Sequence, residues 1–343
     1  MKYKLLVNVC LLFASTHHAQ PGLFFNVSGG YGAPALQQTL QAITFQPNGT
    51  DPAGSIIVPL INQNISDSAS LKFQSNAYQG YSNGGTVNFV AGYMISHYVG
   101  LEIGFASLFG KKLTGKSVFD DPATLGRNVS INTTTWSYGI TMSPSIRLQA
   151  SRPDAAFVPY GRFGLTIPFW GKTIHELDIA APDFLNTKLP ASAKVRAETQ
   201  SVFSIGFNGS VGVGYNITTW LRVFGEAIAN YLFVRSGKTT LTRYDLTFNG
   251  ETSDLLPSYT TYSKVTSFVD KLDENSNTTV FGKKRAAANP QPGDKVVNED
   301  APREELRRAA NFSAFGFNLG FTFTINNYLW KKKDKRKPLP LNP

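Results

Sequence analysis

The chain of 343 residues has one cysteine and no long apolar run. The cysteine, Cys10, lies in the apolar core of a segment that we expect to be removed, so the mature chain has no thiol and disulfides are excluded. No stretch of about twenty apolar residues occurs, which excludes membrane-spanning helices. If the chain crosses a bilayer, it must do so as a closed β-barrel, because lipid tolerates no open sheet edge.

Charge and histidine are also scarce. Charged residues make up 16% of the chain, which instead holds 25 Phe, 14 Tyr and 30 Gly. This composition is unlike that of a disordered chain and lacks the Leu, Glu and Lys bias of a helical one. Of four histidines, two lie in the expected leader. The other two, without cysteine, give no tetrahedral ligand set, so we expect neither a metal nor a cofactor.

The first twenty residues read as a secretory signal. Lys2 and Lys4 precede an apolar core, Leu5–Ala14, and a small residue, Ala19, follows near the exit. This order is typical of a cleaved leader. We therefore expect a signal peptide over 1–19 and a mature barrel over 20–330.

The net charge of +10 is partly concentrated after the final strand, in Lys331–Lys337. No recognition helix or zinc spacing accompanies it, so we expect no nucleic-acid partner. A basic end on a secreted chain is typically solvated or touches anionic headgroups. The interpretation is a basic periplasmic tail over 331–343.

The segment Ala314–Thr324 is the most informative stretch of the chain. It places large apolar side chains on every second position, at Phe315, Phe317, Leu319, Phe321 and Phe323. Glycine, Asn and Thr fill the positions between them. Because side chains alternate between the two faces of a strand, one face is bare hydrocarbon and the other is small and polar. This pattern predicts a strand with a lipid-facing side and a crowded lumen.

Seven further segments alternate in the same way. With the first, they predict eight strands at Leu23–Tyr31, Thr86–Met94, Val99–Phe109, Thr133–Leu148, Phe157–Pro168, Ser201–Tyr215, Trp220–Phe233 and Ala314–Thr324. Short links near Ser96, Ser151 and Asn216 alternate with long loops at about 32–82, 110–132, 169–197 and 235–310. This asymmetry is typical of outer-membrane barrels. The fold class is therefore all-β: an eight-stranded antiparallel transmembrane β-barrel with long extracellular loops, short periplasmic turns and both termini in the periplasm.

Alternation also places five charged residues in the lumen. They are Glu102, Arg147, Arg162, Arg222 and Glu226. Lone buried ions are costly, so we expect them to pair across neighbouring strands. An eight-stranded barrel is just wide enough for side chains to fill. We interpret the set as a polar core that fixes the barrel, with a gate or narrow conduit as the alternative.

Three phrases resemble a known family. They are Gly100-Leu101-Glu102-Ile103-Gly104, Pro159-Tyr160-Gly161-Arg162-Phe163-Gly164-Leu165 and Phe224-Gly225-Glu226. They are similar to small outer-membrane β-barrel proteins (the OmpA/OmpW-like porin family) common in Bacteroidota. The resemblance covers nearly the whole mature chain. It implies a location in the outer membrane. Unlike OmpA-type proteins, the chain is expected to carry no C-terminal peptidoglycan-binding domain.

Two loop residues are candidates for chemistry. His175, beside Glu176 and Asp178 in an expected outer loop, is the one candidate base for a lipid-modifying enzyme. A base needs a partner within hydrogen-bond reach, and none is fixed there, so we expect a surface histidine without a catalytic role. Asp67-Ser68-Ala69 matches a short O-glycosylation pattern of Bacteroidota, which makes Ser68 a candidate acceptor.

These observations leave three functions open. We favour a non-enzymatic barrel that acts through its long loops, as an accessory or scaffold subunit of an outer-membrane complex or as a surface-binding protein. The alternatives are a narrow OmpW-like transport barrel for small amphipathic solutes and a lipid-modifying enzyme. The expected partners are outer-membrane lipids, including lipopolysaccharide, and other outer-membrane proteins.

Overall fold

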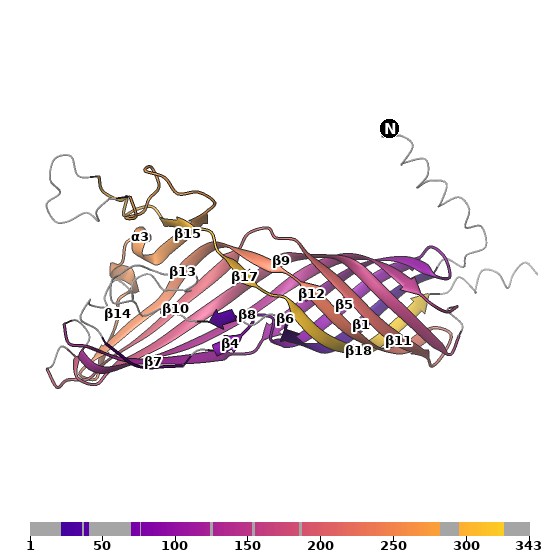
Figure 1. Cartoon of the computed structure of the whole chain (residues 1–343), viewed down its shortest axis with the longest axis horizontal. Helices are drawn as coiled ribbons and strands as arrows, with labels where there is room; N and C mark the ends of the chain where they lie inside the picture. The colour runs from indigo at the N-terminus through magenta and orange to yellow at the C-terminus, as the bar shows by residue number, and fades with distance from the viewer. Residues whose placement is uncertain are drawn as a thin grey trace, which may run out of the picture.

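The computed structural model describes residues 22–35, 38–40, 70–75, 77–123, 126–152, 155–184, 187–281 and 295–325. Nearly all ordered elements are strands, and one sheet contains 16 of them. Figure 1 shows a long molecule whose inclined strands form a barrel in one half and continue as a taller wall in the other. We call these halves the barrel and the extension.

Eight strands of the sheet close into a ring. Their bounds are β1 Gly22–Pro34, β5 Gly84–Met94, β6 Val99–Gly110, β8 Gly126–Gln149, β9 Phe157–Ala181, β11 Gly206–Asn216, β12 Leu221–Tyr231 and β18 Ala314–Ile325. Each ring strand pairs antiparallel with the ring strands before and after it in the chain. β1 and β18 complete the ring in a register that runs from Leu23↔Ile325 to Pro34↔Ala314. The predicted all-β barrel is confirmed.

The short links, the start of β1 and the end of β18 lie at one end of the barrel. The links between β5 and β6, β8 and β9, and β11 and β12 are all here. Gly22, at the start of β1, pairs with Met94 at the end of β5, and Leu23 pairs with Ile325. We call this the turn end, and the extension rises from the opposite end.

The two faces of the wall differ as the alternation predicts. In β18, Phe315 is 62% exposed and Phe321 48%, whereas Asn318 and Thr322 are 3% and 2% exposed. Phe317, Leu319 and Phe323 are exposed as well. Stacked side chains such as Phe163 and Phe207 continue this apolar outer surface around the ring.

The extension is built from strands, and this differs from the sequence-based expectation of loops. Segments 110–132 and 169–197 are largely β-structure, because β8 begins beyond the ring and β9 continues past it, and the described part of 235–310 also contains strands. The added strands are β2 Gln38–Leu40, β3 Ser70–Ser75, β4 Ala77–Gln79, β7 Leu113–Asp121, β10 Ala191–Ser201, β13 Phe233–Phe248, β14 Glu251–Asp254, β15 Val265–Val269, β16 Arg303–Leu306 and β17 Ala309–Asn311. Of the expected loop 32–82, the described part also contains the strands β2, β3 and β4, and the rest lies outside the described residues.

The extension encloses its own apolar core. Inward side chains of five strands form it: Phe119, Val129, Ile131, Leu177, Ile179, Ala181, Ala193, Val195, Ala197 and Leu241. The outward positions between them are polar, as at Glu176 and Asp178 beside Leu177. These segments have the alternation of a half-buried sheet in a soluble protein. Their polar outer residues are also typical of solvated loops, which is why the sequence predicts loops there.

Local sequence explains the hairpin at the tip and the short helical turns. Asn249 and Gly250 have φ of 48° and 86° and join β13 to β14 as a two-residue turn. This Asn-Gly pair is the preferred sequence for such a turn. The described residues include two short helical elements, η2 (Leu256–Ser258) and α3 (Thr261–Lys264). The side chain of Thr260 caps α3 by accepting a hydrogen bond from the Ser263 amide. Neither element is long enough to span a membrane, and no other described helix is.

Close strand contact inside the ring predicts that Gly320 is irreplaceable. A Cβ at Gly320 would overlap the Val27 carbonyl oxygen across the closing pair. We expect Gly320→Val to lower the unfolding free energy by about 1–3 kcal/mol through overpacking. Phe321→Leu, one residue away on the lipid side, serves as the control and should change it by less. Urea unfolding with heat-modifiable gel mobility measures both, and equal effects would contradict the assignment of faces.

Candidate functional site

The lumen of the barrel holds the five predicted ions in one buried group. Glu102, Arg147, Arg222 and Glu226 are 2–6% exposed, and the Arg162 side chain is 15% exposed. They lie on β6, β8, β9 and β12, on the inward positions that alternation assigns to them. We call Glu102, Arg147, Arg162, Arg222 and Glu226 the lumen ion network.

Arg162 is the centre of this network. Its guanidinium contacts Glu102 Oε2 at 3.5 Å and pairs with Glu226 on the far side. Arg147 Nη1 contacts Glu102 Oε1 at 3.2 Å. The chain of pairs runs Arg147, Glu102, Arg162, Glu226 and crosses the lumen from β8 to β12. Arg147 and Glu102 pair across neighbouring strands as expected, but Arg162 pairs with two carboxylates that each lie two strands away.

Neutral side chains complete the hydrogen bonding of the Glu226 carboxylate. Tyr160 donates from its hydroxyl to Glu226 Oε2 at 3.0 Å, and Ser210 donates to the same oxygen at 3.3 Å. Asn318 donates from Nδ2 to Glu226 Oε1 at 2.9 Å. With Arg162, Glu226 is thus held by four partners from three strands, β9, β11 and β18. Alternation predicts that Tyr160 and Asn318 face the lumen. Because neither residue is charged, the charge pattern of the sequence does not identify them as partners of Glu226.

The other two arginines lie toward the turn end. Arg147 lies over the Tyr160 ring, with its guanidinium carbon 3.9 Å from the centroid, and has Phe24 on another side at 5.2 Å. Arg222 donates to Gln149 Oε1 at 3.2 Å and to Asn216 Oδ1 at 2.8 Å. Arg222 is therefore anchored by two amide side chains. Side chains of β1, β8, β9 and β12 thus meet at this level of the lumen.

The inward face changes character along β8 and β9. Arg147 pairs in register with Arg162, followed by small residues up to the facing glycines Gly139 and Gly171. Hydroxyl side chains come next, with Ser137 Oγ 2.8 Å from Thr173 Oγ1. Above them lies the apolar core of the extension. The interior therefore has an ionic layer, a small-residue layer, a hydroxyl layer and an apolar layer.

His175 belongs to the hydroxyl layer and is not a surface loop residue. It lies on β9, opposite Thr135, and is 3% exposed. Its Nδ1 is 3.1 Å from Thr135 Oγ1, and its Nε2 has no hydrogen-bond partner among the described residues. It points away from Glu176 and Asp178, because adjacent strand residues face opposite sides. The expectation of an exposed histidine is wrong, and the lipid-modifying hypothesis loses its candidate base.

Burial also sets the charge state of His175. It lies beyond the Trp170 level, outside the membrane-spanning wall, where burial lowers its pKa from 6.5 to about 4. The ring is therefore neutral near pH 7. The described residues contain no group of three or more His, Cys, Asp or Glu side chains arranged to hold a metal ion.

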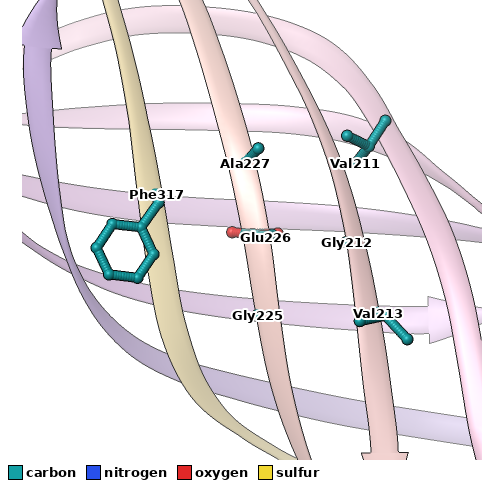
Figure 2. A pocket seen from close by; sticks show the side chains of 7 residues that line it. All are labelled: Val211, Gly212, Val213, Gly225, Glu226, Ala227 and Phe317. Carbon is teal, nitrogen blue, oxygen red and sulfur yellow. The ribbon is translucent and has the colours of Figure 1, made fainter.

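A depression lies on the outer wall of the barrel. It lies over β11, β12 and β18, with Val211, Val213, Ala227 and Phe317 around its rim and Gly225 at its base (Figure 2). Glu226, between Gly225 and Ala227, points to the lumen side, where its partners are. The depression is therefore an apolar dent in the lipid-facing surface.

An aromatic belt marks where the barrel meets the extension. Phe169, Trp170 and Phe203 are 75%, 52% and 68% exposed, and Tyr138 packs against Trp170 at 5.4 Å. Such belts mark the membrane–water interface of outer-membrane barrels. The predicted signal peptide, Ser68 and the basic tail lie outside the described residues and stay predictions.

Comparison with known proteins identifies the family. The family model for the outer membrane protein beta-barrel domain matches residues 9–249. The chain therefore belongs to this family and is an outer-membrane β-barrel protein. The resemblance inferred from the sequence is confirmed at this level, and the assignment to Bacteroidota stays a prediction.

Solved structures include a more distant likeness. The crystal structure of the outer membrane protein OprG from Pseudomonas aeruginosa matches with 11% sequence identity and a TM-score of 0.36. The match covers 90% of this chain and 98% of that chain. No curated protein sequence matches the chain significantly.

Removing Arg162 should destabilise the barrel strongly. Arg162→Met deprives Glu226 of its cation and leaves Glu102 with Arg147 alone. Breaking a buried pair in this way costs about 3–5 kcal/mol. Urea unfolding followed by tryptophan fluorescence measures the loss.

The control for this prediction is an exposed ion pair of the extension. Lys295 and Glu274 are 3.5 Å apart, with side chains 65% and 80% exposed. Lys295→Met should cost at most about 1 kcal/mol. If Arg162→Met lowers the unfolding free energy no more than Lys295→Met does, the lumen ion network does not stabilise the fold.

His175 should make the extension sensitive to acid. Its pKa is lowered from 6.5 to about 4 in the fold, so the unfolded chain binds more protons between these values. The stabilisation is complete above about pH 6.5 and is lost as the pH falls toward about 4, by about 3 kcal/mol in total. His175→Gln should abolish this part of the pH dependence. Unfolding free energies of both proteins between pH 7 and pH 4 test it, and parallel curves would contradict it.

Proposed function

We propose that the protein is a non-conducting, non-enzymatic barrel that holds the extension outside the cell. There it serves as an accessory or scaffold subunit of an outer-membrane assembly, or as a surface-binding protein. The observation that carries the proposal is the filling of the interior at two levels. The lumen ion network occupies the barrel, and the apolar core occupies the extension.

The orientation follows from the two unequal ends. Short turns and both ends of the described chain lie together, and outer-membrane barrels place short turns in the periplasm. We assign the turn end to the periplasm and the extension to the cell exterior. The extension is then the part of the chain that can meet other molecules, through an outward face that is polar and charged.

A narrow transport barrel is the second candidate. Between the ion network and the hydroxyl layer, the inner wall carries Gly139, Thr141 and Ser143, which are small and half-buried. A small amphipathic solute that used this small-residue layer would have to enter above the ion network and leave sideways through the wall. Uptake of such solutes by cells that carry the protein would favour this candidate.

Planar-bilayer recording of the purified full chain separates the two candidates. We expect no single-channel steps from the native protein, because buried ion pairs block the lumen. Arg162→Ala together with Glu226→Ala should add brief openings if the variant folds, which heat-modifiable mobility reports. Steady conductance by the native protein would contradict the proposal.

Cross-linking in native membranes tests the assembly form of the proposal. It should capture partner proteins at the extension, and a protein that is never cross-linked to another would contradict the assembly form.

A further inference from the structure

A row of lysines lies directly above the aromatic belt, on the outward face of the wall. Tyr138 on β8 pairs in register with Lys172 on β9, Lys172 with Gln200 on β10, and Gln200 with Lys238 on β13. One rung of the sheet thus carries two lysines and no carboxylate. Lys112 joins the row from the link between β6 and β7, with its Nζ 4.7 Å from the Trp136 ring centroid. We call Lys112, Lys172 and Lys238 the boundary lysines.

The boundary lysines are only partly neutralised. Lys172 contacts Glu198 at 2.8 Å, and this contact raises the pKa of Lys172. Glu198 is itself shared with Arg196, whose guanidinium carbon lies 5.8 Å from the Trp136 ring centroid. Among the described residues, neither Lys112 nor Lys238 forms an ion pair with a carboxylate, and both are exposed. The row therefore has an excess of positive charge.

The row lies at the level of lipid headgroups. Trp170 and Phe169 are the outward residues just before Lys172 on β9, and they mark the membrane interface. Lys172 and Lys238 are separated by one strand, or about 10 Å. A phosphate at this height would meet more than one ammonium group, and acyl chains attached to it would lie along the exposed rings below.

We propose that the boundary lysines bind the phosphate groups of a phosphorylated glycolipid in the outer leaflet. The charge of the row is complementary to a phosphate, and Lys is a common phosphate ligand. The aromatic belt beneath supplies the apolar contact that free phosphate would lack. The inference rests on the proposed function for one point, the orientation that puts the extension outside.

Native mass spectrometry of the full chain in detergent tests the proposal, with bisphosphorylated lipid A as the probe. Lys112→Gln, Lys172→Gln and Lys238→Gln together should weaken binding about ten-fold or more. The matched control removes the same charge higher on the extension, at Lys116, Lys188 and Lys194, and should change binding less than about two-fold. Dephosphorylated lipid A should bind the native protein as weakly as lipid A binds the triple variant.

Three results would overturn the proposal. Equal losses in the two triple variants would show general electrostatic attraction. Unchanged binding in the boundary variant would place the lipid elsewhere. Displacement of lipid A by millimolar inorganic phosphate would show a site for a soluble anion. None of these results depends on conductance, so the proposed non-conducting role stands or falls separately in the bilayer recording.

Discussion

Hydrogen-bonded closure between β1 and β18 is the constraint on which the other features depend. Inside a bilayer every backbone donor and acceptor must be paired within the protein, so a sheet is stable there only as a ring. Closure fixes the register of all eight ring strands, and register fixes which side chains face lipid and which face the lumen. The phenylalanine ladder and the lumen ion network are two consequences of the same alternation.

The interior follows from the size of this ring. Eight strands leave room for side chains and little else, so the five ions must be satisfied within the wall. Glu226 gains Arg162, Tyr160, Ser210 and Asn318, and glycines such as Gly320 allow the strands to approach. Where β8 and β9 leave the membrane, the inner face changes from ions through hydroxyls to hydrocarbon, and the outer face changes from hydrocarbon to charge. Each face thus suits its surroundings at each height.

The alternation of apolar and small residues in the sequence is sufficient to predict the ring strands but not the strands of the extension. The eight strands and the inward placement of Glu102, Arg147, Arg162, Arg222 and Glu226 could be predicted, because bare aromatic residues alternate with small ones only beside lipid. In the extension, Leu177 and Ile179 alternate with Glu176 and Asp178, and a polar face beside an apolar one is common in any soluble segment. His175 was placed on the surface for that reason. Its burial depends on β10 and β13, which pair over long separations that a local pattern does not reveal.

Cysteine cross-linking across the closing pair tests the central claim, the closed ring in this register, most directly. Val27 and Phe321 are register partners on the outer face, and directly opposite Cβ atoms are about 5 Å apart. A chain beginning at Gln20 has no native cysteine, so Val27→Cys with Phe321→Cys should form a disulfide on oxidation after folding into lipid. Val27→Cys with Phe317→Cys, offset by about 13 Å along the strand, should form none. Cross-linking of the offset pair, or of neither pair, would contradict the closed ring.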